Sequence, residues 1–339
     1  MIVPSRLRST SPPLAFPHLK RHGYKYQVWS QSCCGRAWLE PFWATLPCGL
    51  SDDEIKRRWY RTLPAHGRAE LAHRLVDAFG PEVCAQVPGL YVKEQDGRRW
   101  WSLAGAAGLL IPVRDMEGRL TAFIVRHDDL EADLRYSSIS SKKYGGPGSG
   151  AHIHVPLYES ASRDMIRLTE GILKADVATV LSGCLTIGLP GVSAWRRALP
   201  VLTGLQAHVV ALAFDTDARH NWHVARALQH TARALKAAGF QLVLERWTEE
   251  RGKGVDDLLA AGYVPEVLTG AAMWEAIGTI VNAARLSDPL RQRQRLLAMQ
   301  QGYLQQHRLP AVDPWLGPPG MLHGIPLAVR RIGEEAARG

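Results

Sequence analysis

The chain has 339 residues, of which 46% are hydrophobic and 22% are charged, as in soluble globular proteins. This length suits two compact domains, or one domain with extensions. No apolar run is long enough to span a membrane, and no apolar segment near the N-terminus has the form of a secretory signal. We therefore expect a cytoplasmic protein with no membrane partner.

Five cysteines are present, without Cys-x-x-Cys spacing, and we expect them to be reduced thiols. One imaginable zinc cluster, formed by His18, His22, Cys33 and Cys34, contains adjacent cysteines, which chelate a single ion poorly. No zinc is therefore expected.

The formal net charge of +9 favours a polyanionic partner. Residues 1–50 are expected to form a basic, aromatic extension, because residues 1–39 contain six basic residues, no acidic one and interleaved Tyr and Trp. Cations and flat rings together are typical of proteins that bind single-stranded nucleic acid. The alternatives are a solvated leader and an organelle transit peptide.

Residues 51–155 are expected to form a smaller α+β subdomain. Helices are predicted from Ser51, which begins a capping box, and over 67–80 between two glycines. Three strands are predicted within 98–103, 108–115 and 118–129, the last two joined by a turn that ends at Gly118. The glycine-rich stretch 144–152 predicts either a mobile loop or a hinge.

Residues 156–268 alternate between strand and helix patterns, which predicts an α/β domain whose parallel four-stranded sheet has helices on both faces. The strands are expected within 164–169, 184–191, 207–214 and 240–247, and the helices within 173–183, 193–204 and 218–239. Residues 269–339 are expected to form a helical C-terminal region and tail.

Acidic residues follow three of the four predicted strands, at the edge of the sheet where ligands bind. They are Glu170, the pair Asp215 and Asp217, and the pair Asp256 and Asp257. Side chains at i and i+2 of an extended segment point the same way, so Asp215 and Asp217 can aim at one cation, such as Mg²⁺ or Mn²⁺. Glu170 would be a third ligand or a general base.

Each acid also has a structural interpretation when it is taken singly. Asp217 is placed to cap the helix that follows it, and Asp256 is placed to cap the segment 257–262. Taken together at one edge, the acids favour a metal site.

The order of these acids resembles the TOPRIM domain of bacterial replicative primases, topoisomerases and several nucleases. The matching residues are Glu170-Gly171, Asp215-x-Asp217, Lys253 and Asp256-Asp257. The segment 108–138 resembles the primase RNA-polymerase core, with a Pro-x-Arg-Asp-x-x-Gly hairpin, an arginine strand and a basic-Tyr-x-Ser element. The chain is also similar to DUF3854 proteins of plasmids, phages and integrative elements, some of which are fused to helicases.

The resemblance implies a Rossmann-like TOPRIM fold and a set of site residues. Glu170, Asp215 and Asp217 would be the catalytic, metal-binding acids, with Asp256 or Asp257 contributing nearby. The nucleotide or nucleic-acid contacts would be Arg126, Arg135, Lys142, Lys143, Lys174 and Lys253. For Lys142 and Lys143 the alternative is a pair of solvated loop lysines.

The sequence departs from the primase pattern at two positions. Lys174 stands where primases have an aspartate four residues after the glutamate, and whether Asp176 substitutes for it depends on the helix phase. His220 stands where many TOPRIM domains have glycine. Neither a zinc ribbon nor a Walker A motif is recognisable, so no helicase activity is expected of this chain.

The resulting functional hypothesis is a primase-like TOPRIM protein of a mobile element. It would perform metal-dependent nucleotidyl transfer, making RNA primers on single-stranded DNA, with a separate replicative helicase as a further partner. One alternative is a TOPRIM metal-dependent nuclease. Another is a non-catalytic, nucleic-acid-binding replication accessory, which Lys174 and His220 favour.

Overall fold

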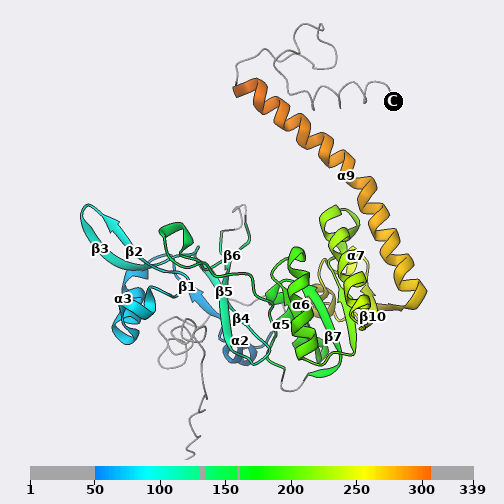
Figure 1. Cartoon of the computed structure of the whole chain (residues 1–339), viewed down its shortest axis with the longest axis horizontal. Coiled ribbons are helices and arrows are strands. Elements are labelled where there is room, and N and C mark those ends of the chain that lie inside the picture. Colours follow the sequence, from blue (N-terminus) through cyan, green and yellow to red (C-terminus); the bar gives the residue numbers. More distant parts are fainter. Residues whose placement is uncertain (1–49, 130–133, 159–160, 307–339) are drawn as a thin grey trace, which may run out of the picture.

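The computed structural model describes residues 50–129, 134–158 and 161–306. The described chain forms two lobes, each built on its own sheet, and a long helix extends from the second lobe (Figure 1). The predictions for the basic, aromatic extension and for the C-terminal tail concern residues outside the described ones. The predicted domain boundaries stay predictions.

The first lobe contains an antiparallel four-stranded sheet in the order β1-β4-β5-β6. Its strands are β1 (Arg61–Leu63), β4 (Gly108–Arg114), β5 (Leu120–His127) and β6 (Tyr136–Ser138). The predicted β4–β5 hairpin is present, and Gly118, at φ +76°, donates its N–H to the Asp115 carbonyl at 3.0 Å. This left-handed conformation is easiest for glycine.

Helices α2 (Asp52–Arg58), α3 (Arg68–Phe79) and α4 (Pro81–Cys84) belong to the same lobe. The helix expected from Ser51 is α2, and the Ser51 hydroxyl accepts the Glu54 N–H at 3.3 Å as an N-cap. The helix expected over 67–80 is α3.

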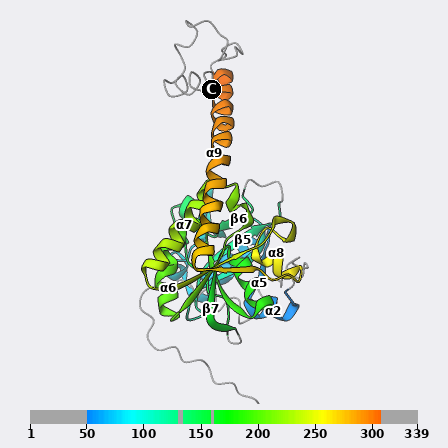
Figure 2. The same ribbon diagram turned by 90° about the vertical axis from the view of Figure 1, so that its right-hand side faces the viewer.

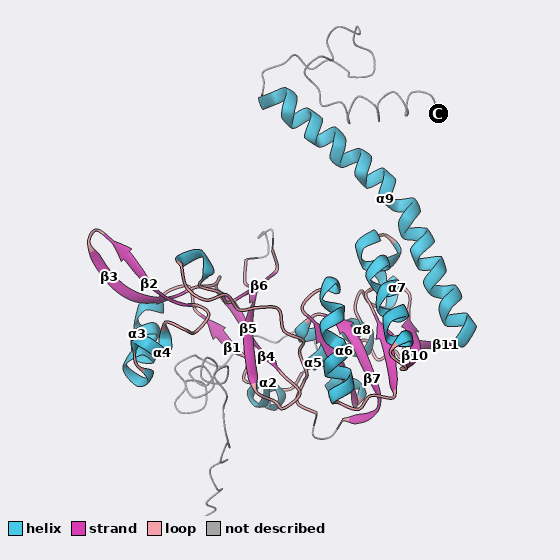
Figure 3. Ribbon diagram, in the orientation of Figure 1, coloured by secondary structure: helices cyan, strands magenta, loops and turns pink. Residues whose placement is uncertain are grey.

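A separate two-stranded ribbon, β2 (Leu90–Gln95) with β3 (Arg98–Leu103), projects from the first lobe (Figure 3). The sequence analysis predicted β3 but missed β2, because only its first residue is buried and the period-two pattern is weak. The missed signal is the Asp96-Gly97 turn, where both residues have positive φ, as two-residue hairpins favour.

The second lobe confirms the predicted α/β fold. Four parallel strands, β7 (Ser162–Glu170), β8 (Cys184–Leu189), β9 (Val209–Ala213) and β10 (Gln241–Arg246), lie in a sheet of order β11-β10-β9-β7-β8. The analysis missed β11 (Glu266–Thr269), which pairs antiparallel with β10 at the sheet edge. β11 has only four residues, three of them exposed, so it is too short to show a buried period-two pattern in the sequence.

Helices cover both faces of this sheet, as predicted (Figure 2). One face carries α5 (Ile172–Ser182) and α8 (Val255–Ala260), and the other carries α6 (Ala198–Gly204), α7 (Trp222–Ala237) and the start of α9 (Gly270–Gln306). Met273, Ile277, Val281 and Ala284 of α9 are buried at helical spacing, and the rest of α9 extends away from the lobe (Figure 1). None of the helices in the described part of the chain combines the length and apolar character that a membrane crossing requires.

A buried ion pair crosses the middle of this sheet. Arg167 of β7 donates from Nε to Oε2 of Glu245 at 2.6 Å and from Nη2 to Oε1 at 3.0 Å. The strand between them places Ala211 directly beside Arg167, and this small side chain leaves room for the two long ones to meet. The bidentate geometry is the favourable one for an arginine and a carboxylate.

Helix α5 joins the two lobes. Its residues Ile172, Leu173 and Val177 pack in one apolar cluster with Leu109 and Ile111 of β4. Because α5 begins directly after β7, this packing fixes the carboxyl edge of the second sheet against the first lobe.

Candidate active site

The fold brings the predicted acids to one edge of the second sheet. Glu170 is the last residue of β7, and Asp215 lies two residues after β9, its direct neighbour in the sheet. Asp217 lies in the short 3-10 helix η3 (Thr216–Arg219), and Asp256 lies in the first turn of α8, after β10. This is the carboxyl edge at which parallel sheets bind ligands.

Lys174 of α5 engages Asp215 directly. Its ammonium donates to Oδ1 of Asp215 at 2.6 Å and to Oδ2 at 2.5 Å, so both oxygens of this carboxylate are occupied. Burial acts to lower the pKa of Lys174, but the charge and hydrogen bonds of Asp215, together with the charges of Asp256 and Glu170, outweigh it, and the lysine pKa is raised. Burial raises the pKa of Asp215, and Lys174 opposes that rise.

Glu170 sits half-buried beside this pair. Burial, reinforced by the charge of Asp215, raises the pKa of Glu170 above its ordinary value. Within the described residues, no hydrogen bond or ion pair reaches its carboxylate directly. Glu170 is therefore the acid of this edge whose oxygens are most available to a ligand.

Asp217 does not cap the helix that follows it, contrary to the structural interpretation of the sequence. Asn221 caps α7, because its side-chain oxygen accepts the His223 N–H at 3.1 Å. One oxygen of Asp217 lies 3.3 Å from Nζ of Lys253. The other oxygen, Oδ1, is buried and has no hydrogen-bond partner among the described residues.

Gly254 is the N-cap residue of α8, and Asp257, not Asp256, supplies the capping carboxylate from the third position of the helix. Oδ2 of Asp257 accepts the Gly254 N–H at 3.1 Å, which corrects the expectation that Asp256 takes this role. Burial raises the pKa of Asp256 to about 6. Its Oδ1 atom is buried and accepts no hydrogen bond from the part of the chain that the structure describes.

Asp176 does not take the place of the aspartate that primases have at the position of Lys174. The phase of α5 turns Asp176 toward the first lobe, where it is 2% exposed. Arg58 donates to its Oδ1 at 3.1 Å, the Tyr60 hydroxyl donates to its Oδ2 at 2.5 Å, and Nε2 of His154 lies 3.2 Å from Oδ2. Asp176 thus stabilises the junction between the lobes.

The carboxylates of this edge suit a hard divalent cation by donor type. The unpartnered, buried oxygens of Asp217 and Asp256 are what such an ion would satisfy. Lys174, however, holds both oxygens of Asp215, and no group of three or more His, Cys, Asp or Glu in the described ranges is drawn together as a metal site. By donor type the residues fit an ion at this edge, and in this structure the Lys174 ammonium occupies the oxygens of Asp215.

The first lobe contributes basic residues near the acidic edge. Arg126 of β5 pairs in register with Tyr136 of β6, and Arg135 precedes that tyrosine. Burial raises the pKa of Tyr136, and this hydroxyl also feels the charges of Arg126, Arg135, Asp256 and Lys174. The sequence analysis used Tyr136 only as part of the basic-Tyr-x-Ser motif, but in the structure this residue, 43% exposed, feels charges from both lobes.

Lys142 and Lys143 lie in the 3-10 helix η1 (Lys142–Tyr144), which packs beside the β2–β3 ribbon. There Tyr144 stacks on Tyr91, with ring centroids 3.8 Å apart and planes 6° from parallel. The glycine-rich loop around η1 is held by Ser141, whose hydroxyl accepts the Gly89 N–H at 3.2 Å. The contacts described for the two lysines do not include the acidic edge.

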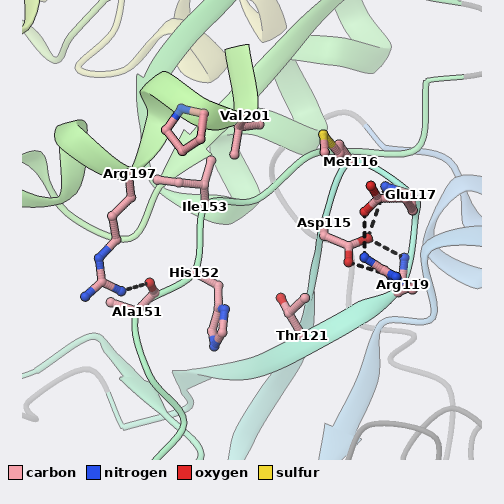
Figure 4. Close-up of a pocket in the computed structure, with 11 residues that line it drawn as sticks. Asp115, Met116, Glu117, Arg119, Thr121, Ala151, His152, Ile153, Arg197 and Val201 are labelled. Atoms are coloured by element: carbon pink, nitrogen blue, oxygen red, sulfur yellow. Dashed lines mark hydrogen bonds and ion pairs between the residues drawn. The ribbon is translucent and has the colours of Figure 1, made fainter. Parts of the chain in front are cut away.

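A cavity of about 420 Å³ lies between the β4–β5 turn and the segment 197–201 (Figure 4). Its charged lining is largely self-paired, because Arg119 contacts both Asp115 and Glu117 at 2.8 Å. Arg197 bonds the Ala151 carbonyl. None of the predicted site residues lines this cavity.

The chain is similar to a known protein family and to solved structures of primases. Residues 160–264 match the family described as Domain of unknown function (DUF3854), which confirms that resemblance over this segment. The Aquifex aeolicus primase, solved as its zinc-binding and RNA polymerase domains, is similar with a TM-score of 0.53 and 14% identity, over 76% of this chain and 64% of that one. The chain has a primase-like fold. It spans 64% of the length of that primase chain.

Two further solved structures are similar to the chain. One is a DnaG primase catalytic domain bound to ssDNA, with a TM-score of 0.49 and 17% identity, over 84% of this chain and 90% of that one. The other is the RNA polymerase domain of Mycobacterium tuberculosis DnaG with a double-stranded DNA oligomer that has a 6-nucleotide overhang, with a TM-score of 0.47 and 15% identity, over 77% and 82%. No curated protein matches the sequence.

Proposed function

We propose that this chain is a primase-like TOPRIM protein that joins ribonucleotides into an RNA primer on a single-stranded DNA template. The observation that carries the proposal is the meeting of the two lobes. The acids Glu170, Asp215, Asp217 and Asp256 occupy one sheet edge, and the packing of α5 on β4 sets this edge against the first lobe, where β5 carries Arg126 and Arg135 precedes β6. An acidic edge facing fixed cations is suited to nucleotide phosphates and a metal ion together.

Each residue has a role in this proposal. Glu170, Asp215 and Asp217 would hold Mg²⁺ or Mn²⁺, with Asp256 nearby, and the ion would supply stabilisation of the charge on the attacking and leaving oxygens. Arg126 and Arg135 would hold phosphates of the template or the incoming nucleotide. Lys253, 60% exposed and near Asp217, would orient that acid and meet the nucleotide from the other side.

A primer-synthesis assay tests the proposal. The full chain is incubated with single-stranded DNA, labelled ribonucleotides and Mg²⁺ or Mn²⁺, and the products are separated on a denaturing gel. We expect short labelled oligoribonucleotides, lost in Asp215→Asn and kept in Asp164→Asn, an exposed acid near the other end of β7. No product from the intact chain, or equal product from Asp215→Asn, would refute the proposal.

One alternative function has a specific observation in its favour. The double contact of Lys174 with Asp215 gives this edge an internal cation, which suits a nucleic-acid-binding accessory that needs no metal. Binding of single strands that does not depend on divalent ions, without turnover, would support it.

Metal-dependent loss of a labelled strand without added ribonucleotides would instead support a nuclease. A mobile-element origin and a helicase partner stay predictions from the resemblance.

A further inference from the structure

Lys174 is held in its position by the shape of the backbone around it. The aliphatic part of its side chain lies over Gly171, where an added Cβ would be 3.5 Å from its Cγ and Cδ atoms. At Gly254 an added Cβ would be 3.0 Å from Nζ and 2.3 Å from Oδ1 of Asp256. Glycine at 254 therefore keeps open the space that the Lys174 ammonium and Oδ1 of Asp256 both border.

The contact of Lys174 is tighter than that of the other lysine at this edge. Its side chain is 25% exposed and reaches both oxygens of Asp215. Lys253 is 60% exposed and reaches only one oxygen of Asp217, at 3.3 Å. A desolvated cation on two carboxylate oxygens interacts far more strongly than an exposed one on a single oxygen.

We propose that Lys174 is an internal competitor for divalent cations, so that an ion can use Asp215 only after the Lys174 ammonium has left it. The released ammonium has a second carboxylate at hand, because the unpartnered Oδ1 of Asp256 faces the same space beside Gly254. Lys174 thereby raises the concentration of divalent cation that is needed to fill the site. This inference rests on the proposed function, since it takes the acidic edge to be a metal site.

Mn²⁺ binding to the full chain, measured by isothermal titration calorimetry, tests the competition. Lys174→Met is expected to lower the Kd for Mn²⁺ at least about tenfold, because a buried opposing charge is removed from Asp215. Lys236→Met, which removes an exposed lysine in the last turn of α7, is the matched control, with an expected change in Kd below about threefold. Asp215→Asn reports whether the titrated ion uses this edge. An unchanged or higher Kd in Lys174→Met overturns the inference.

The outcomes separate the two proposals. Mn²⁺ binding that Asp215→Asn abolishes and Lys174→Met leaves unchanged overturns the competition and keeps the metal site. Binding to none of the proteins overturns the metal site and the inference with it.

A second measurement uses the unaltered protein. Acetylation of lysines by acetic anhydride, read by mass spectrometry, is expected to be slow at Lys174 without metal and several-fold faster with saturating Mn²⁺, while Lys253 changes less. Equal rates at Lys174 with and without Mn²⁺ contradict release of the ammonium.

Discussion

Arg58, the last residue of α2, donates from Nε to Oδ1 of Asp176 on α5 at 3.1 Å, and both side chains are almost fully buried. Burial acts to raise the pKa of Asp176, but His154, Arg58 and Tyr60 outweigh it, and the pKa is lowered. The carboxylate therefore contributes stability above its ordinary pKa, and this contribution is lost as the pH falls through the lowered value.

Asp176→Asn should destabilise the protein by about 3–5 kcal/mol at neutral pH, because it removes the buried carboxylate that Arg58, Tyr60 and His154 share and leaves only the half-buried Glu54 to pair with the Arg58 charge. Urea unfolding measures the loss. Asp164→Asn, on the exposed start of β7, should change the free energy of unfolding by less than about 0.5 kcal/mol. A loss below about 1 kcal/mol in Asp176→Asn would show that the junction does not depend on this ion pair.

Asp256→Asn should stabilise the metal-free protein at neutral pH. Burial raises the pKa of Asp256 from 3.8 to about 6, so the folded state binds this proton more tightly than the unfolded state. Its contribution to stability is full below the unfolded pKa and is lost as the pH rises through about 6.

Unfolding in EDTA should therefore show Asp256→Asn more stable than the natural protein by about 1–3 kcal/mol at pH 7.5, and nearly equal to it at pH 4. Asp257→Ala is the neighbouring control, and it should instead be destabilised by about 1 kcal/mol, because it removes the oxygen that accepts the Gly254 N–H at the start of α8. If the difference in free energy of unfolding between Asp256→Asn and the natural protein were the same at both pH values, the raised pKa of Asp256 would be contradicted.

The sequence was sufficient to predict which acids lie at the carboxyl edge of the second sheet. It was not sufficient to predict which side chains those acids contact. The cap at Ser51 and the turn at Gly118 involve only residues that are close in the sequence, so both could be predicted. The alternation of strand and helix patterns likewise predicts which residues follow parallel strands. These local rules put Glu170, Asp215 and Asp256 at one edge.

The partners of these acids are set by tertiary packing. The contact of Lys174 with Asp215 joins positions 41 residues apart, and that of Asp176 with Arg58 joins positions 118 apart. Both depend on the phase of α5, whose first residues are apolar on more than one side because they pack against both lobes. A helix buried on two faces has no single hydrophobic stripe from which its phase can be read.

Ile277→Ala should destabilise the second lobe by about 2–5 kcal/mol, because this α9 side chain is 1% exposed within the main apolar cluster. Leu286→Ala, two and a half turns farther along the helix and 78% exposed, should change stability by less than about 0.5 kcal/mol. Thermal unfolding of both variants measures the difference. Equal effects would mean that the start of α9 is not part of the folded core.

Arg126→Ala and Arg135→Ala should each weaken binding of single-stranded DNA and change its salt dependence. A residue that contacts one phosphate of a single strand contributes about 0.7 to the slope of log K against log salt concentration. Fluorescence anisotropy with a labelled oligonucleotide, repeated over a range of salt concentrations, should show that loss of slope for each variant. Arg74→Ala, whose side chain pairs with Glu70 on the exposed face of α3, should keep the full slope. A variant that lowers affinity without changing the slope would mean that its arginine supports Tyr136 and the lobe interface and does not meet a phosphate.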